Sequence, residues 1–384
     1  MLTALIFIIV LAVLIFVHEL GHFLAARASG IRVDAFKLGF GPKIFAWKKG
    51  ETEYGVNLIP FGGYVKIHGE NPDEESTTGP DAARSFVNKP RWKQIVVLVA
   101  GVTFNFIFAW VLYASGFMLG VTATSDGFEK YADRFVDNRV MVTYIEKGSP
   151  AEQAGLVVGD VLKVVRTPAS VTSSDPVPTA MSKEVLASDG TLTVASVQEL
   201  ISGNNGAPTT LTIESKGGLN EIKVTPVKGI VEGKYAVGIG MQLVGDLRLP
   251  FFTAIWEGLR YMLVMIRETA VGLWSFVVNL FQGTASLSDV SGPVGIAGIV
   301  GGAAKLGFSY LIMITALISI NLGVINLVPF PALDGGRILF VLIEGIIRRR
   351  IPMKFSNWVN AIGFALLMLL MVVITYRDIA KLFE

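Results

Sequence analysis

The sequence predicts a multi-pass α-helical membrane protein of about four transmembrane helices, with a membrane-associated β-hairpin and an inserted α+β domain. Hydrophobic residues make up 52% of the 384 residues and charged residues only 17%, and the mean hydropathy is +0.57. Soluble chains usually carry about 25% charged residues, so disorder, a coiled coil and an ordinary soluble enzyme fit poorly. Several uncharged stretches approach or exceed the roughly 20 residues that cross a bilayer core as a helix.

Composition also limits the chemistry. The net charge is only +2, which leaves no basic surface for nucleic acid. The chain has no cysteine, so disulfides, iron–sulfur clusters and thiolate zinc sites are excluded. Any metal must therefore be held by nitrogen and oxygen, and the chain has just three histidines to supply the nitrogen.

Four stretches are apolar enough to be transmembrane helices. The first has no charged side chain from Met1 to Val17. It lacks the positive flank and the small-residue cleavage site of a signal peptide, so we expect it to be retained. The predicted transmembrane segments are residues 1–27, 92–122, 305–347 and 355–377.

A further apolar segment, before the third of these, is interrupted by Gly272, Asn279, Gln282 and Gly283. We therefore predict that residues 249–304 form an amphipathic helix at the membrane interface and a glycine-rich loop; a fifth span is the alternative. Basic residues cluster after the first and third spans, and cytoplasmic loops carry an excess of such residues. This predicts that both chain ends and the long polar region lie outside. Four spans satisfy this arrangement, whereas a fifth would break it.

Two regions outside the spans have strand and turn patterns. Residues 126–248 alternate short strands, turns and short helices, which predicts an α+β domain on the outer side. Within it, residues 167–192 are rich in Ser, Thr, Pro and Asp, a composition typical of a mobile insertion. Residues 28–91 should be cytoplasmic and membrane-associated. Their part 36–68 is strand-like, apolar and glycine-rich, which favours a β-hairpin that dips into the membrane face.

The strongest chemical signal is His18-Glu19-Leu20-Gly21-His22 at the end of the first apolar stretch. On a helix, positions i and i+4 share one face, so both imidazoles can bind one metal ion, with the glutamate beside the water that the metal activates. The alternative is two hydrogen-bonded histidines and a salt-bridged glutamate. Ionisable groups within a span are costly and usually functional, which favours the metal site. The third ligand must then be an Asp, a Glu or His68.

Asp334 is the candidate third ligand. Pro329 and Pro331 end the helix before it, so that the Asp-Gly-Gly sequence can turn a carboxylate inward. The alternative is a turn in which Asp334 caps the next helix. The first and third spans both run inward, so His18 and Asp334 should lie at similar depth, and two histidines plus one carboxylate leave zinc an open position for water. We expect His68 to be a surface residue.

With several further motifs, these residues resemble the site-2 protease family of intramembrane zinc metalloproteases, in particular the bacterial regulator-of-sigma-E-protease type with a PDZ domain. The resemblance covers nearly the whole chain. It is carried by the motif at 18–22, Pro60-Phe-Gly-Gly-Tyr-Val-Lys66, Ala100-Gly-Val-Thr-Phe-Asn-Phe106, Ser291-Gly-Pro-Val-Gly295, Asn321-Leu-Gly-Val-Ile-Asn326 and Leu333-Asp-Gly-Gly336.

The resemblance implies one zinc ion per chain, held by His18, His22 and Asp334, with Glu19 activating water. It also implies that Asn326 and Asn321 bind the extended backbone of the substrate. The alternative for both asparagines is hydrogen bonding between transmembrane helices.

A second glycine motif and the outer domain complete the resemblance. For Gly101-x-x-x-Asn105, in the second span, we expect simple close packing of helices. Gly148-Ser-Pro-Ala-Glu-Gln-Ala-Gly155 with Gly159-Asp160 is similar to the turn-and-helix block of a PDZ domain. In such a domain the segment 235–241 could supply the peptide-binding loop and strand. Unlike the most similar type, the chain carries one such domain rather than two.

We therefore expect a zinc metalloendopeptidase of the bacterial cytoplasmic (inner) membrane that acts in regulated intramembrane proteolysis. Its partners would be the lipid bilayer, a peptide ligand of the PDZ-like domain and single-pass transmembrane substrates, such as trimmed anti-sigma factors or remnant signal peptides, cut near the cytoplasmic leaflet. A metal permease is one alternative, but the last span offers few polar residues for a path. A scaffold with an inert membrane body is another, but it would not need Glu19.

Overall fold

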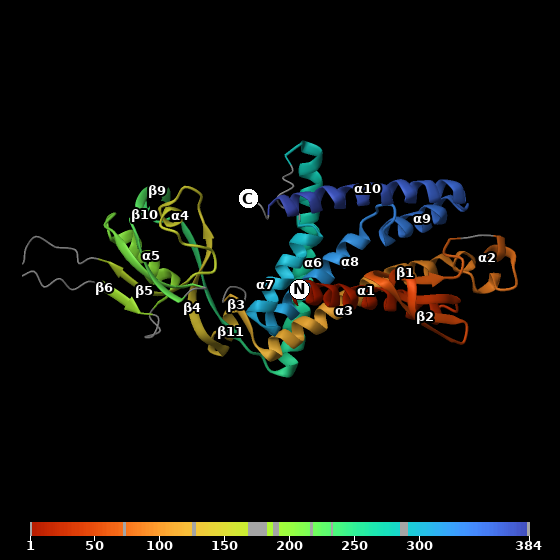
Figure 1. Ribbon diagram of the computed structural model, residues 1–384, viewed down its shortest axis with the longest axis horizontal. Helices are drawn as coiled ribbons and strands as arrows, with labels where there is room; N and C mark the ends of the chain where they lie inside the picture. Colours follow the sequence, from red (N-terminus) through yellow and green to blue (C-terminus); the bar gives the residue numbers. More distant parts are fainter. Residues whose placement is uncertain are drawn as a thin grey trace, which may run out of the picture. The chain divides into compact units, whose positions relative to one another are not determined.

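The computed structural model describes residues 2–71, 74–124, 128–167, 183–186, 192–215, 218–231, 233–284 and 291–381. The chain divides into two compact units (Figure 1). The first unit comprises residues 1–119 and 250–384, and the second comprises residues 120–249.

The first unit is mainly helical. Five of the described helices, α1, α3, α6, α8 and α10, are long and apolar enough to cross a membrane, by length and composition. The chain is thus a multi-pass α-helical membrane protein, as its composition predicts. The helices are α1 (Leu2–Ala28), α2 (Glu74–Thr78), α3 (Arg91–Leu119), α6 (Phe251–Gln282), α7 (Pro293–Leu306), α8 (Phe308–Leu327), α9 (Asp334–Ile347) and α10 (Met353–Ala380), with 3₁₀ turns at Ala82–Arg84 and Phe86–Asn88.

Helix α3 lies at the centre of this unit and packs against α1, α6, α8 and α9. Helices α3 and α1 approach so closely where they cross that no side chain fits between their backbones at this point. A Cβ atom added at Gly21 of α1 would overlap with the carbonyl oxygen of Ala100 on α3. Small residues at such crossings allow helix backbones to touch, and this contact brings the end of α1 against the middle of α3.

Residues 249–304 contain the predicted helix, α6, but the segment predicted as a glycine-rich loop differs. Helix α6 continues without a break through Gly272 and Asn279 and ends at Gly283, whose φ of 72° forms a left-handed cap. A glycine inside an exposed helix costs only about 1 kcal/mol relative to alanine, which a helix of this length tolerates. The predicted glycine-rich loop contains helix α7. Gly301 serves packing, since a Cβ atom there would overlap with Thr3 of α1, whereas Gly298 and Gly302 have open space around them.

Two predicted span boundaries also change. The segment predicted at 305–347 is two helices, α8 and α9, because Pro329 and Pro331 end the first and a six-residue link follows it. The segment predicted at 92–122 ends at Leu119, since Gly120 adopts a φ of 97° and the chain continues into strand β3.

Strands β1 (Val33–Lys49) and β2 (Thr52–Ile67) form the predicted β-hairpin, but each strand is bent. Phe36 lies opposite Val65 and also opposite Tyr54, while the second half of β1 pairs again with the first half of β2. The result is a sheet of four segments in which residues 63–67 form one edge. Gly39 and Gly62, with φ of 79° and 108°, allow the chain to bend at the turns.

The sheet is held against the helices by one apolar cluster. Phe23 and Ala26 of α1, Phe36 and Val65 of the sheet, and Val97 of α3 belong to it, and all are at most 8% exposed. Large apolar side chains on the other part of the sheet remain exposed, among them Phe40, Ile44, Phe45 and Leu58. This distribution agrees with a sheet that meets the membrane.

The second unit is an α+β domain, as the sequence predicts. Its main sheet has the strand order β3-β11-β4-β5-β7-β8, with β6 paired to β5, and β9 and β10 form a separate pair. Its core is built from β-branched and leucine side chains of the strands together with helix α5. The elements are β3 (Val121–Thr124), a 3₁₀ segment Glu129–Arg134, β4 (Phe135–Ile145), α4 (Pro150–Gln153), β5 (Val161–Thr167), β6 (Lys183–Leu186), α5 (Val194–Gly203), β7 (Thr209–Ser215), β8 (Gly218–Val224), β9 (Val227–Val231), β10 (Lys234–Ala236) and β11 (Ile239–Leu247).

The predicted insertion at 167–192 lies largely outside the described residues. Only its two ends and strand β6 are described, and β6 adds to the sheet beside β5.

A buried carboxylate joins the last helix to the start of α7. The backbone N–H of Gly295 donates to Oδ2 of Asp378 on α10 at 2.8 Å, and Asp378 is 8% exposed. We predict that Asp378→Ala leaves this N–H without a partner and lowers the free energy of unfolding by about 1–3 kcal/mol. Thermal unfolding of the detergent-solubilised protein measures the loss. Asp378→Asn, which keeps an acceptor oxygen, is the control, and equal melting of wild type and the alanine variant would contradict the prediction.

Candidate metal centre

Helix α1 presents two histidines on one face near its C-terminal end. His18 and His22 are both 8% exposed, and their Nε2 atoms lie 3.2 Å apart. The rings stand edge to face, with centroids 4.8 Å apart. Their spacing of four residues produces this arrangement, because one helical turn brings both side chains to the same side.

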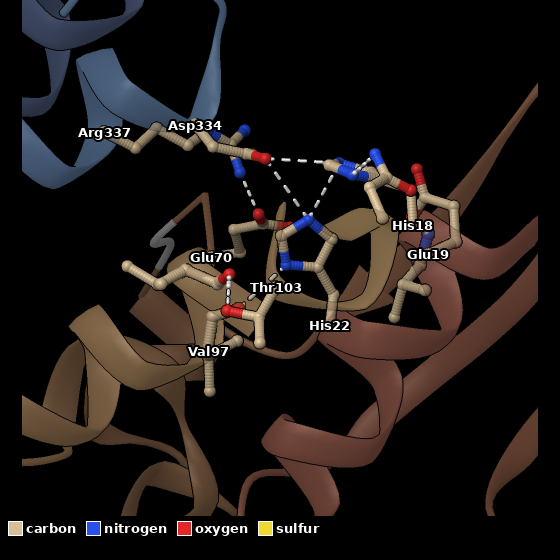
Figure 2. A network of polar contacts seen from close by, with 11 residues as sticks. His18, Glu19, His22, Glu70, Val97, Thr103, Asp334 and Arg337 are labelled. Carbon is tan, nitrogen blue, oxygen red and sulfur yellow. Dashed lines mark hydrogen bonds and ion pairs between the residues drawn. The ribbon is translucent and has the colours of Figure 1, made fainter. Parts of the chain in front are cut away.

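Asp334, which lies on a different helix, points toward the two imidazoles (Figure 2). It is the first residue of α9, and its Oδ2 lies 3.2 Å from Nε2 of His18 and 3.4 Å from Nε2 of His22. The link before it is fixed by a left-handed Ala332, whose N–H donates to Asn360 of α10 at 3.2 Å. Gly335 has no room for a Cβ atom, which would overlap with the backbone at Leu327. The helix start therefore folds tightly back on the end of α8.

The geometry of these three atoms fits a zinc ion. In a tetrahedral site with bonds of about 2.0–2.1 Å, ligand atoms lie about 3.3 Å from one another, and the three separations observed are 3.2, 3.2 and 3.4 Å. Oδ2 of Asp334 is buried and accepts no hydrogen bond within the described structure, so a cation would satisfy it. Two nitrogens and one carboxylate oxygen without a thiolate also suit zinc. Within the described part of the chain, His18, His22 and Asp334 form the group of His, Asp and Glu side chains whose ligand atoms lie close enough together to hold a metal ion.

Glu19 lies beside this group and is oriented by the sheet. The backbone N–H of Val65, in the edge segment of β2, donates to Oε2 of Glu19 at 2.9 Å. One carboxylate oxygen is thus occupied, while the other accepts no hydrogen bond from the residues that the structure describes and can take a proton. Nothing in the sequence pattern predicts this contact, because it depends on how β2 bends toward α1.

Helix α3 holds the outer nitrogens of both histidines. Nδ1 of His22 lies 2.8 Å from the carbonyl oxygen of Val97, and Nδ1 of His18 lies 3.1 Å from the side-chain amide of Asn105. The prediction of simple packing for the Gly101 motif is therefore incomplete. Gly101 does serve close packing, since a Cβ atom there would overlap with His22, but Asn105 contacts His18. The sequence signal that could have pointed to Asn105 is a polar amide within an apolar span. Asn105 lies eight residues after Val97, on the same helix face.

A partly buried ion pair lies next to the group. Arg337, one helical turn after Asp334, pairs with Glu70 in the segment after β2 (Figure 2). Their side chains are 33% and 18% exposed. The pair joins α9 to the sheet region, so it connects the helix that carries Asp334 to the strand that holds Glu19.

The other predicted residues lie apart from the three ligand atoms. Oδ1 of Asn321 accepts a hydrogen bond from Thr269 of α6 at 3.1 Å. Asn326 is half-buried in the last turn of α8, eight residues before Asp334. His68 is not a surface residue, because its side chain is only 11% exposed and its Nδ1 lies 3.9 Å from Asp34. Its backbone is held by two neighbouring segments, because its N–H donates to the carbonyl of Arg32 and its carbonyl accepts from the N–H of Phe86.

Two buried histidines, a carboxylate and a neighbouring glutamate at the end of an apolar helix define a membrane-embedded metallopeptidase. A family model described as Peptidase family M50 matches residues 6–370, and the chain belongs to this family, the site-2 proteases. It is a zinc-dependent metalloendopeptidase, as the sequence motifs predict. This identification sets aside the permease and the inert scaffold.

Several bacterial relatives are similar over almost their whole length. A Clostridium perfringens protein, provisionally named a zinc metalloprotease, is 36% identical over 370 residues, which are 95% of each chain. The zinc metalloprotease RasP of Geobacillus kaustophilus is 32% identical over 418 residues, covering 98% of this chain and 97% of its own. RasP of Shouchella clausii is 30% identical over 457 residues and covers both chains completely.

The convergence of the three atoms gives a test of metal binding. We predict that Asp334→Ala weakens zinc binding by at least about 100-fold, since the loss of outer partners of metal ligands alone costs 10–100-fold. Zinc affinity is measured by competition with a chelator. Glu268→Ala is the control, because this carboxylate lies on α6 and is 52% exposed. An Asp334→Ala variant that binds zinc as tightly as the wild type would show that Asp334 is not a ligand.

Proposed function

We propose that this protein is an intramembrane endopeptidase that cleaves single-span membrane proteins near the cytoplasmic leaflet. In this proposal His18, His22 and Asp334 bind zinc and Glu19 is the general base. The observation that carries it is the meeting of three ligand atoms, 3.2–3.4 Å apart, at the end of an apolar helix, with Glu19 held beside them by a sheet edge.

The chemistry follows from the position of Glu19. Bound zinc would polarise the scissile carbonyl and lower the pKa of a water molecule. Glu19 takes the proton of the attacking water and passes it to the leaving amine. The N–H of Val65 fixes one oxygen of the carboxylate, so that the other stays directed at the reaction.

The sheet supplies a means to hold an extended substrate. A transmembrane helix must unwind before hydrolysis, because its carbonyls are engaged in helical hydrogen bonds. An extended peptide can add as a strand to an open sheet edge. We propose that it adds to the edge segment at residues 63–67, and the contact of Val65 with Glu19 supports this by placing the edge beside the base. Asn326 and Asn321 would bind the same extended chain from the side of α8.

We propose four membrane spans, α1, α3, α8 and α10, with the chain ends outside and the metal site toward the cytoplasm. The distribution of basic residues supports this orientation. Helix α6 is long enough to span, but Figure 1 shows it running across the direction of α3, α8 and α10 rather than along it. That course suits a helix lying at the interface, and it leaves the positive-inside pattern intact. The membrane would be the bacterial cytoplasmic membrane.

The second unit is proposed to act as a PDZ-like domain. A cavity of about 590 Å³ lies between α5 and the start of β11, and Gln198, Tyr235 and Ile239 are among its lining residues. In a PDZ domain a peptide adds as a strand in a groove of this kind. By the basic-residue argument the unit lies outside, whereas the sixteen residues of α1 before His18 rise about 24 Å. The unit would therefore select substrates, such as trimmed anti-sigma factors or remnant signal peptides, rather than supply a catalytic group.

The role of Glu19 is tested by Glu19→Gln. We predict that this variant keeps near-normal zinc affinity and thermal stability but loses at least about 10²-fold in cleavage rate, the usual contribution of a general base. The measurement is cleavage of a single-span model substrate in detergent or liposomes. Glu268→Gln, far along α6, serves as the control, and unchanged turnover in Glu19→Gln would end this mechanism.

Removal of the second unit tests its role as a filter. We predict that a variant in which a flexible linker replaces residues 120–249 binds zinc normally and still cuts a substrate whose outer part has been trimmed. Its discrimination against a substrate with a large outer domain should weaken. Both substrates are compared with the full-length protein. If the folded, zinc-loaded deletion cuts neither, the unit belongs to the catalytic machinery.

A further inference from the structure

One face of α3 lies against both histidines of the proposed zinc site. Val97, Gly101 and Asn105 follow one another at four-residue steps and so share this face. Gly101 leaves the space that the imidazoles fill. Val97, one turn before it, lies against Nδ1 of His22, and Asn105, one turn after it, lies against Nδ1 of His18. Asn105 is completely buried.

The partner of each Nδ1 decides which ring nitrogen can bind a metal. A neutral imidazole carries one proton, so a histidine that offers the Nε2 lone pair must carry the proton on Nδ1. For His22 this condition is met, because a carbonyl oxygen, that of Val97, faces Nδ1 at 2.8 Å and can only accept. His18 needs an acceptor at the equivalent place.

Asn105 can supply that acceptor through one rotation. Its amide nitrogen faces Nδ1 of His18 at 3.1 Å, while its Oδ1 is buried and receives no hydrogen bond within the described structure. A half-turn of the amide exchanges the two atoms without moving anything else, since the oxygen and nitrogen ends have the same shape. Oδ1 then accepts the Nδ1 proton of His18, which gives the buried oxygen a donor.

We propose that Asn105 is a positioning residue for the metal centre: its side-chain oxygen accepts the Nδ1 proton of His18 and so holds the Nε2 lone pair toward zinc. The opposite orientation, in which the amide donates to Nδ1, places the proton on Nε2 and blocks metal binding. The amide therefore distinguishes a metal-competent ring from an incompetent one. The proposal rests on the proposed zinc ligation by His18.

The backbone of Asn105 is itself fixed. The hydroxyl of Ser319 on α8 donates to the carbonyl of Asn105 at 2.9 Å, and both groups are buried. The contact between α3 and α8 thus sets the height of the amide along α3, opposite His18. Helix α8 also leads, through the link, to Asp334 at the start of α9. One helix therefore supports both Asn105 and Asp334.

Two substitutions separate accepting from donating. Asn105→Asp keeps an oxygen that, as a carboxylate, can only accept, and Asn105→Leu has a similar volume but can do neither. The readout is zinc affinity of the full-length protein by chelator competition, together with the visible absorption bands of the cobalt(II)-substituted protein, which report ligand geometry. We expect Asn105→Leu to bind zinc about 10–100-fold more weakly with altered cobalt bands. We expect Asn105→Asp to keep the wild-type bands and an affinity within a few-fold of the wild type.

Matched controls keep the outcomes distinct. Thr103→Val changes an exposed residue on the same helix that bonds only within that helix, to Val99, and should alter nothing. If Asn105→Asp loses as much affinity as Asn105→Leu, the amide donates and the proposal is wrong. Unchanged affinity and bands in Asn105→Leu would overturn it equally, and Asn105→Ala repeats this arm if the leucine variant does not fold. If Asp334→Ala also leaves zinc affinity unchanged, the failure lies in the zinc site itself.

Discussion

Gly21 of α1 and Gly101 of α3 lie where the two helix backbones touch, and the metal centre depends on this contact. Side chains at either position would separate the helices. The imidazoles of His18 and His22 would then lose the hydrogen-bond partners on α3 that orient their outer nitrogens. In a bilayer the association of helices draws little on the hydrophobic effect and relies on close packing and buried hydrogen bonds. The same contact thus supplies both the stability of the helix pair and the orientation of two ligands.

The proposed third ligand, Asp334, is positioned in a different way. Asp334 is separated from α8 by a link whose prolines prevent a continuous helix, and the link is tied to α10 through Asn360. Gly335 and Gly336 allow the start of α9 to press against the backbone of this link. The carboxylate is therefore placed by a tight backbone turn, whereas the histidines are placed by helix packing. Metal binding would join these two independently positioned parts.

Patterns within one element could be predicted from the sequence, and contacts between elements could not. The spacing of His18 and His22 predicts a shared helix face, and apolar length predicts the long helices α1, α3 and α10. Alternating strands and turns predict the second unit. The bends of β1 and β2, the contact of Val65 with Glu19 and the burial of His68 depend on how distant segments meet. Sequence alone does not say which side of an apolar helix faces α1, so it predicts only packing for Asn105. The glycines of α7 predict a loop, because the contact of Gly301 with Thr3 depends on how α7 meets α1.

Glu19 is the point at which these parts meet. It lies on α1 between the two histidines, and its carboxylate is held by the edge of a sheet that exposes apolar side chains elsewhere. Movement of that edge would turn the carboxylate while the histidines on α1 and their hydrogen-bond partners on α3 stayed in place. The partly buried pair of Arg337 and Glu70 limits such movement, since it joins the segment after β2 to α9 one turn from Asp334. In the proposed mechanism, a substrate strand added to this edge would act on Glu19 through Val65 and on α9 through the ion pair of Arg337 and Glu70. The binding of an extended substrate and the alignment of Glu19 with Asp334 would then be mechanically coupled.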